Sequence, residues 1–456
     1  METHRLFYPR PESVPPPPTP VRPEGASREI AAERPPLTVK LLQRLRKESG
    51  TSATFFLDGA LHVALFAPEQ VAQVLTQNPK MFLPGVQESA FSAAIGWGLI
   101  SQEGADHLST RRQIHSGMHG DILEAFSPDI VDLARTVIAD WREKGDIALV
   151  TEVRRLAHQS LLRTLFRGNT ADVDVNYESY ALRLNDALMR SARDDQTPES
   201  RKQIWSGYTS DRSAISDYVS DLIRAHDDAE VQEGKSLISL LIAGGAPACP
   251  IQPGSGLHGQ VALFLQAGIE TTSSVLAWAT MLLGRRPELW TALKKEADVA
   301  LGATPPLSVP ELLVLPTVSG VLNEAMRLFP PLWLFPRIAL EDIEISGITI
   351  AKGTRVILSP FITQRDPGVF SRPRQFLPER WLNQKPASLA PGSFFPFGAG
   401  SRVCVGERLA RLNATIMLLT LAQGPPPLSK FSDFTLDNAM MLISPRSSVR
   451  LRLPPA

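Results

Sequence analysis

The chain has 456 residues, of which 43% are hydrophobic and 21% are charged, so it can bury a large core. Lys plus Arg equals Asp plus Glu, at 47 each, and this neutral balance argues against a nucleic-acid-binding protein. Two cysteines, Cys249 and Cys404, exclude a disulfide framework and indicate a reducing compartment.

Residues 1–35 are rich in proline and contain no apolar stretch of the length of a signal peptide or a membrane anchor. Proline lacks an N–H donor and favours extended chain. We therefore expect a flexible arm over 1–35, with a proline-rich recognition ligand as the alternative, and a single domain over 36–456.

The pattern after the arm predicts helices interrupted by a few strands. Short strands around Asp58-Gly59 predict a hairpin, and a helix is expected to begin at Pro68. Further helices are predicted within 121–242 and, after a Gly- and Pro-rich break, at 257–283, 318–329 and 409–421. Strands are expected within 339–360 and 439–453. The predicted fold class is mainly α with a small β region (α+β).

The longest predicted helix carries "AGIETT" in its middle. Glu270 would be expensive in lipid, so a core helix is favoured over a membrane span. Thr hydroxyls can bond to backbone carbonyls and bend a helix, and such distortions are frequent at functional sites. A satisfied polar patch in a core helix is the simpler interpretation of this stretch alone.

The segment "NEAMR" places Glu324 and Arg327 three residues apart on one helix face, among apolar neighbours. A buried ion pair needs further partners to offset desolvation. "FLPERWL" offers such a partner in Arg380.

The segment "FGAGSRVCVG" places Cys404 between Arg402 and the start of a helix. Cations and helix N-termini lower cysteine pKa values, so a thiolate is expected. Zinc is excluded because no second cysteine or histidine lies at ligand spacing. A nucleophilic cysteine needs a base that the sequence does not place. A sole thiolate ligand of an iron porphyrin fits best, and a buried structural cysteine is the alternative.

Taken in order, "AGIETT", "EAMR", "FLPERW" and "FGAGSRVCVG" resemble the motifs of the cytochromes P450, which are haem-thiolate monooxygenases, in a bacterial-type form. The resemblance implies haem b, iron protoporphyrin IX, between the long distal helix and the proximal helix after the cysteine loop. It also implies that O2 is used to hydroxylate or epoxidise a hydrophobic small molecule, such as a terpenoid or another secondary metabolite.

The resemblance assigns Cys404 as the iron ligand, and Glu270 and Thr271 as the acid–alcohol pair that delivers protons. Small residues at Ala267 and Gly268 would leave room for O2. Other cofactor-binding residues that it implies are Phe397, Gly398, Arg402, Gly406, His107, Arg111 and Arg337. Glu324, Arg327 and Arg380 would lock the proximal core. Candidate pocket residues are Phe264, Leu332, Leu334, Phe335, Met440, Met441 and part of 85–101.

Two positions depart from the family pattern: Asn413 stands where Glu is common, and Gln364 stands where His is frequent. Both are expected to touch supporting interactions rather than the iron ligand.

No flavin, iron–sulfur or reductase segment is evident, so the resemblance implies a separate ferredoxin or flavodoxin with its NAD(P)H reductase. A basic docking face is predicted from Arg111, Arg112, Arg402, Arg408 and Arg411, with haem binding and solubility as the alternative roles of these arginines. We expect a soluble, cytoplasmic monomer without a transmembrane anchor. Two other functions remain: a haem-thiolate isomerase or dehydratase of the same fold, and a haem-based sensor or binding protein.

Overall fold

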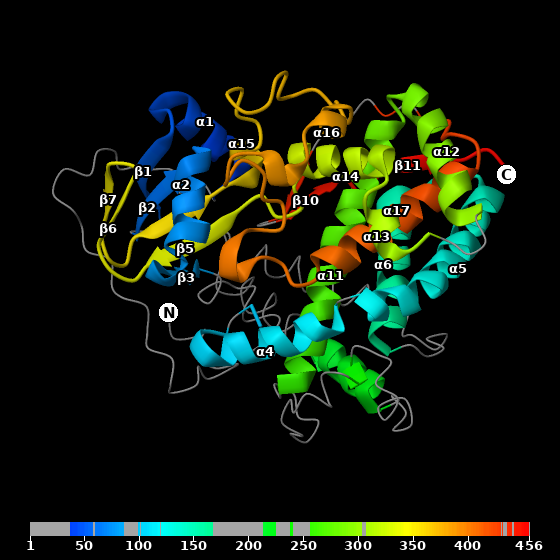
Figure 1. The fold of residues 1–456 in the computed structure, drawn as a ribbon, viewed down its shortest axis with the longest axis horizontal. Coiled ribbons are helices and arrows are strands. Elements are labelled where there is room, and N and C mark those ends of the chain that lie inside the picture. The colour runs from blue at the N-terminus through cyan, green and yellow to red at the C-terminus, as the bar shows by residue number, and fades with distance from the viewer. Residues whose placement is uncertain are drawn as a thin grey trace, which may run out of the picture.

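The computed structural model describes residues 37–57, 60–85, 99–100, 102–118, 120–166, 213–224, 238–239, 256–302, 307–429, 431, 436–439 and 442–455. The predicted arm over 1–35, Cys249, Met440 and Met441 lie outside these residues. Helices fill one side of the molecule, and a small sheet with its covering helices fills the other (Figure 1).

The main sheet has five strands in the order β1-β2-β8-β5-β3. The pairing of β2 with β8 is parallel, and the other pairings are antiparallel. The strands are β1 (Ser52–Leu57), β2 (Ala60–Leu65), β3 (Phe82–Pro84), β5 (Phe335–Ala339) and β8 (Arg355–Leu358). Two-stranded ladders join β6 (Ile343–Ile345) to β7 (Ile348–Ile350), β4 (Asp146–Ala148) to β11 (Arg450–Arg452), and β9 (Leu436–Ala439) to β10 (Leu442–Pro445).

The helices that build the helical side are α4 (Gly104–Gly117), α5 (Gly120–Lys144), α6 (Leu149–Phe166), α11 (Gly256–Leu283), α12 (Pro287–Gly302), α13 (Val309–Leu313), α14 (Pro316–Leu328) and α17 (Glu407–Gln423). Shorter helices accompany the sheet and the loops: α1 (Val39–Ser49), α2 (Pro68–Ala72), α15 (Pro360–Thr363) and α16 (Arg380–Asn383). A π-helical turn, η2 (Gln73–Gln77), extends α2, and short 3₁₀ turns lie at Pro79–Met81 (η3), Pro386–Ser388 (η5) and Gly400–Arg402 (η6).

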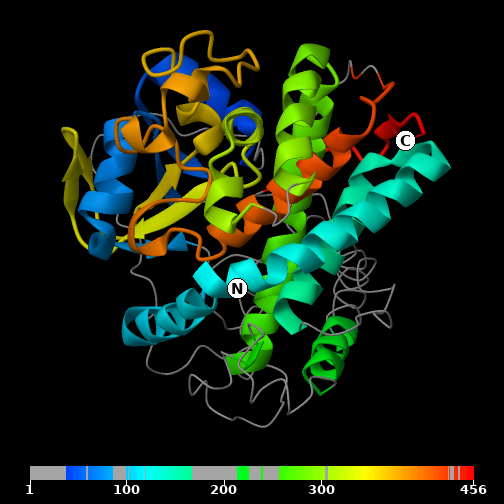
Figure 2. The same ribbon diagram turned by 45° about the vertical axis from the view of Figure 1, so that its right-hand side comes forward.

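The α11 helix runs through the middle of the helical side and contacts α6, α14, α17 and β10 (Figures 1 and 2). Its side chains from Leu257 to Leu283 are all buried or partly buried, as expected for a helix that is surrounded by protein. Among the helices that the structure describes, none combines the length and the hydropathy needed to cross a membrane.

The predicted elements agree well with the structure where it describes them. The hairpin strands β1 and β2 pair up to Leu57 and Ala60, on either side of the predicted turn. The helices predicted at 257–283, 318–329 and 409–421 correspond to α11, α14 and α17. The single helix expected from Pro68 is instead α2 followed by η2 and η3, and the strand β4 interrupts the helical stretch after 121.

Candidate active site

A cavity of about 320 Å³ lies where α11, α14, α17 and β5 converge, with α4 and α6 closing its sides. The cavity brings together most of the residues that the sequence singled out: Phe264, Ala267, Gly268, Glu270, Thr271, Leu332, Leu334, Phe335, His107, Arg111, Arg337, Phe397, Arg402, Cys404 and Gly406. Gly398, Glu324, Arg327 and Arg380 do not line it. Leu99 and Ile100 are the described lining residues from the segment 85–101.

The loop that carries Cys404 is held by its own backbone. The Cys404 N–H donates to the Phe397 carbonyl at 2.9 Å, and the Gly398 N–H donates to the Phe395 carbonyl at 2.9 Å. Gly400 has a φ of 69°, and a Cβ there would lie 1.9 Å from the Leu75 carbonyl oxygen. Only glycine allows this approach, so the loop packs tightly against η2.

The Cys404 side chain is exposed within the cavity but lies deep in the protein. Burial raises the pKa of this thiol to about 11, and the charge of Glu407 adds to the shift, against the opposing effects of the Gly406 backbone and Arg111. The expectation that the loop alone favours a thiolate is therefore wrong, because desolvation outweighs the nearby donors. A coordinated metal ion deprotonates a thiol, so the iron itself would have to supply this effect.

Positive charge gathers beside the cysteine. Burial lowers the pKa of Arg337 to about 10, and the charge of Arg402 lowers it further. Burial likewise lowers the pKa of Arg402 to about 10, with Glu103 opposing and Arg111 reinforcing the shift. The pKa of His107 falls to about 4 because of burial and then of Arg402 and Arg111, so its imidazole is neutral at pH 7. This end of the cavity favours an anionic ligand.

The distal wall is the middle of α11, which continues as a helix through "AGIETT". Thr271 Oγ1 donates to the Ala267 carbonyl at 2.7 Å. Glu270 forms a two-point ion pair with Arg154 of α6: Nε to Oε1 at 2.8 Å and Nη2 to Oε2 at 2.9 Å. Each side chain is 11% exposed, so the predicted acid is already held by a cation.

Sequence reasoning missed the contribution of α6. Arg154, Ala157 and Leu161 are spaced three and four residues apart, so they share one helix face. Ala157 and Leu161 line the cavity, and Arg154 binds Glu270. The available signal was that helical spacing puts Arg154 on the face of Ala157 and Leu161, although its partner on a distant helix could not be identified from the sequence.

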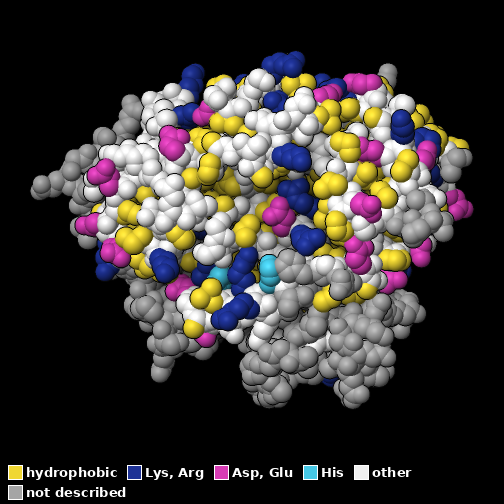
Figure 3. Space-filling view, viewed as in Figure 1, with side chains coloured by type: hydrophobic (Ala, Val, Ile, Leu, Met, Phe, Trp, Pro, Cys, Tyr) yellow, Lys and Arg dark blue, Asp and Glu magenta, His cyan; other side chains and the backbone are white. Residues whose placement is uncertain are grey.

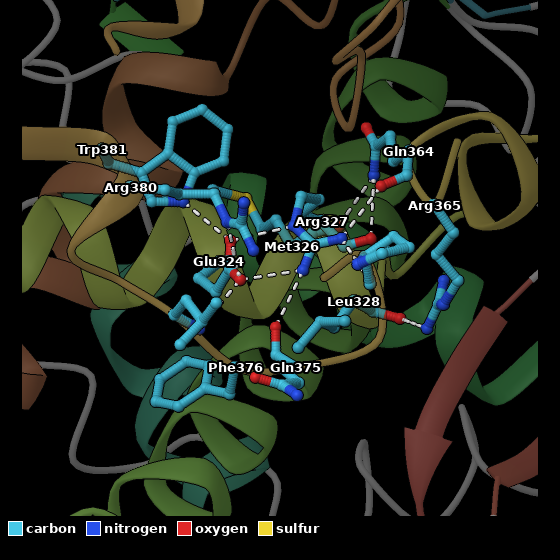
Figure 4. Close-up of polar contacts among 12 residues, drawn as sticks. Glu324, Met326, Arg327, Leu328, Gln364, Arg365, Gln375, Phe376, Arg380 and Trp381 are labelled. Carbon is cyan, nitrogen blue, oxygen red and sulfur yellow. Dashed lines mark hydrogen bonds and ion pairs between the residues drawn. The ribbon is translucent and has the colours of Figure 1, made fainter. Parts of the chain in front are cut away.

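The Glu324 carboxylate is completely buried and organises the region behind the cysteine loop (Figure 4). It accepts two bonds from Arg327, at 2.8 and 2.9 Å, and one from Arg380 Nε at 3.1 Å. The Trp381 indole at 2.9 Å and the Leu377 N–H at 3.0 Å complete the set. The structure thus brings the three predicted charged residues into one network outside the cavity.

Gln364 connects this network to the cysteine loop (Figure 4). Its Nε2 donates to the Met326 carbonyl at 3.1 Å, and its Oε1 accepts from the Phe395 N–H at 2.9 Å. The Arg327 guanidinium donates to the Gln364 backbone carbonyl at 3.0 Å. At the other departure from the family pattern, Asn413 is buried on the cavity wall, and its Oδ1 has no hydrogen-bond partner.

The arginines of the predicted docking face do not form one uniformly positive surface. Arg111 and Arg402 line the cavity, and Arg411 pairs with Glu407 at 2.9 Å and lies 5.0 Å from the Phe397 ring. Arg112 is exposed on α4. Basic side chains lie along the middle of the face shown in Figure 3, with acidic side chains among them.

Comparison with known proteins places this fold and site in one class. The sequence profile described as "Cytochrome P450" matches residues 15–424. Cyclooctatin synthase of Streptomyces melanosporofaciens is 32% identical over 365 residues, covering 78% of each chain. Pentalenene oxygenase of Streptomyces avermitilis is 28% identical over 361 residues, covering 78% of this chain and 79% of that protein.

Solved structures show the same fold at lower identity. The cytochrome P450DA heme domain superposes with a TM-score of 0.77 at 22% identity, over 90% of this chain and 91% of that chain. A 6-coordinated cytochrome P450 from Thermus thermophilus gives a TM-score of 0.69, also at 22% identity, over 91% and 97%. The chain belongs to the cytochrome P450 family and is a haem-dependent monooxygenase.

The cavity fits the haem that the family implies. Among the described residues, no carboxylate forms an ion pair with Arg337 or Arg402, although both are partly buried and line the cavity with Cys404. Buried cations without counter-ions are costly. The two carboxylates of a haem would supply the missing negative charge, and the sulfur of Cys404 opens into the same space.

Proposed function

We propose that this monooxygenase binds haem b through Cys404 and oxidises a hydrophobic small molecule of the terpenoid class. The observation that carries the proposal is that Cys404, two partly buried arginines and the Glu270-Thr271 pair line one cavity. When bound, the haem supplies O2 activation, with a thiolate ligand favouring O–O cleavage. One oxygen atom enters the substrate and the other leaves as water.

The proposed cofactor contacts follow from the cavity. Cys404 Sγ would ligate the iron, and Arg337 and Arg402 would bind the propionates. Neutral His107 would offer a hydrogen bond at the same end. Gly398, with a φ of 73°, permits the loop conformation that carries Phe397 and Cys404.

The proposed proton route uses Glu270 and Thr271. Thr271 lines the cavity, and its Oγ1, which donates to the Ala267 carbonyl, would accept a hydrogen bond from a water there. Glu270 would accept a proton from solvent only after it moves away from Arg154, because its Oε2 accepts a hydrogen bond from Nη2 and its Oε1 lies 2.8 Å from Nε. Arg154 therefore positions the acid between turnovers.

The cavity and the relatives support the proposed substrate class. Phe264, Leu332, Leu334 and Phe335 present apolar walls. One relative is named cyclooctat-9-en-7-ol 5-monooxygenase and another pentalenene oxygenase, and both names describe unsaturated carbon skeletons. A cyclic terpene hydrocarbon or its alcohol fits a site with many apolar contacts and few polar groups.

The proposed electron donor is a separate ferredoxin or flavodoxin with an NAD(P)H reductase. P450 monooxygenases receive their electrons from redox partners, and the family profile accounts for residues 15–424 of this chain. Arg112, which is exposed on α4, supplies positive charge for such a partner.

The experiment combines a spectrum with an oxygen label. Reduced holoprotein treated with CO is expected to show the red-shifted Soret band of thiolate-ligated haem, and Cys404→Ser is expected to lose it. Cyclic terpenes are then incubated with ferredoxin, reductase, NADPH and isotopically labelled O2, and mass spectrometry follows the label. Product that forms without O2 would indicate an isomerase or dehydratase. A normal spectrum without any product across the terpene series would contradict the proposed substrate class.

A further inference from the structure

The α6 helix forms a wall of the substrate cavity. Ala157 and Leu161 lie four residues apart on its α11-facing side, and both line the cavity. One turn earlier on the same face, Arg154 binds Glu270. The α6 wall is thus apolar at Ala157 and Leu161, and the charged group one turn away is paired with Glu270.

Gly268 and Leu161 face each other between α11 and α6, and both line the cavity. A Cβ at position 268 would lie 2.9 Å from Leu161 Cδ2, closer than real Cβ contacts allow. The absence of a side chain there lets the Leu161 isobutyl group pack directly against the backbone of α11. The nearest atoms to a side chain at position 268 belong to Leu161, and the expected room for O2 at Gly268 stays a prediction.

Leu161 is 6% exposed, and it belongs to the main hydrophobic core. The isobutyl group therefore has two neighbours: packed core on one side and cavity on the other. Shortening it would extend the cavity toward α6 without removing a polar contact. Because this side chain is a pure hydrocarbon, its role at the wall is one of volume and shape.

We propose that Leu161 is a specificity-determining residue that ends the substrate cavity on the α6 side and so limits the length of the molecule that binds. The proposal rests on the proposed function and deepens it. The substrate end that meets Ala157 and Leu161 is a hydrocarbon group without polar substituents, because this wall offers it no donor or acceptor and a buried unpaired polar group is costly.

The probe is a series of 1-alkylimidazoles of increasing chain length. Their imidazole nitrogen binds the haem iron and shifts the Soret band, which reports affinity without turnover. Each methylene that enters an apolar cavity improves affinity by about fourfold. In the wild type the gain stops at the chain length that reaches the wall. In Leu161→Ala the gain continues for roughly one to three further methylenes, because the substitution removes three carbons.

Leu162→Ala is the matched control. Leu162 neighbours Leu161 on α6 and is completely buried, but it does not line the cavity. Its truncation removes the same atoms from the core and is expected to lower stability while leaving the limiting chain length unchanged. If Leu161→Ala does not fold, Leu161→Val provides the same comparison with a smaller extension.

The outcomes separate this inference from the proposed function. Alkylimidazoles that shift the spectrum with the same limiting length in wild type, Leu161→Ala and Leu161→Val would overturn the role of Leu161 and leave the haem site standing. An extended limit in Leu162→Ala as well would also overturn it, because general loosening of α6 would then be the cause. Loss of the thiolate-type spectrum in the wild type would instead contradict the proposed function.

Discussion

Thr271 is the residue whose proposed role depends most on a single atom. Its Oγ1 donates to the Ala267 carbonyl at 2.7 Å and lies on the cavity wall. Thr271→Ala should leave O2 consumption in place but lower product formed per O2 by roughly tenfold or more, because general acid–base groups typically contribute at least that much. The measurement compares an oxygen electrode trace with product yield.

Two substitutions control this prediction. Thr271→Ser keeps the hydroxyl and should retain most of the coupling. Thr272→Ala removes the neighbouring hydroxyl, which also lines the cavity, and should have little effect on coupling. Equal coupling in Thr271→Ala and the wild type would show that Oγ1 takes no part in proton delivery.

His158 makes the stability of the protein depend on pH. Burial lowers its pKa to about 4, from an ordinary value of 6.5, so the folded protein keeps this ring neutral. Between pH 6.5 and 4 the unfolded chain binds a proton that the folded chain does not, so stability falls as pH falls through this window. The loss amounts to about 3 kcal/mol at pH 4.

Urea unfolding of holoprotein at pH 7 and pH 4 measures this loss. His158→Gln should remove this pH dependence of the free energy of unfolding. The difference in unfolding free energy between variant and wild type should therefore change by about 3 kcal/mol between pH 7 and pH 4. His107 has a lowered pKa in both proteins, so its contribution cancels in the difference. Parallel profiles would contradict the prediction.

Most residues singled out from the sequence line one cavity, but the sequence did not predict the electrostatics of that cavity. The glycine-rich loop and Arg402 identified Cys404 as a candidate iron ligand, and the structure places Arg402 and Cys404 in one cavity. The direction of the Cys404 pKa shift was wrong because burial depends on chain segments far away in the sequence. The Glu270–Arg154 pair was missed for the same reason, since 116 residues separate its members.

At the scale of elements, the Glu324 carboxylate joins α14 to α16 and to the chain that leads into the cysteine loop. Glu324→Gln keeps the shape of the side chain but leaves Arg327 and Arg380 buried without a counter-ion. We expect a loss of about 3–5 kcal/mol in the free energy of unfolding, which is typical when one member of a buried ion pair is removed.

The control for Glu324 is an exposed pair. Asp146 binds Arg450 at 2.9 Å, and their side chains are 40% and 55% exposed. Asp146→Asn should cost about 1 kcal/mol or less, because water screens such pairs. Urea unfolding of each holoprotein gives both values. Similar small losses would show that the Glu324 network does not hold the proximal region together.

The elements with strong local signals were predicted well. The length and hydrophobicity of α11 and the turn between β1 and β2 can be recognised from local sequence alone. The pairing of β4 with β11 and the parallel pairing of β2 with β8 join segments roughly 300 residues apart, and no local pattern encodes such contacts. The α6 wall of the cavity was missed because its register against α11 depends on Gly268 and Leu161 fitting together.

At the scale of the whole molecule, α4 separates the cavity from the outer surface. His107 and Arg111 line the cavity from one face of this helix, while Leu108 is 52% exposed and Arg112 is exposed on the other face. The chain has no net charge, so any attraction for an acidic electron carrier must be local. The outer face of α4 combines an apolar side chain with a positive charge, as a transient docking site requires.

Arg112→Glu should therefore slow electron delivery without altering the active site. At low ionic strength we expect the second-order rate constant for reduction by ferredoxin to fall by about tenfold, while the maximal rate at saturating ferredoxin is unchanged, because rim charges act mainly on association. The difference in rate constant between Arg112→Glu and the wild type should vanish at about 1 M salt, where charges are screened within about 3 Å.

Lys295→Glu on α12 makes the same change in net charge at a distant exposed position and should have little effect (Figure 1). Stopped-flow reduction under CO measures these rates, and equal slowing by both substitutions would show that ferredoxin responds to overall charge rather than to α4.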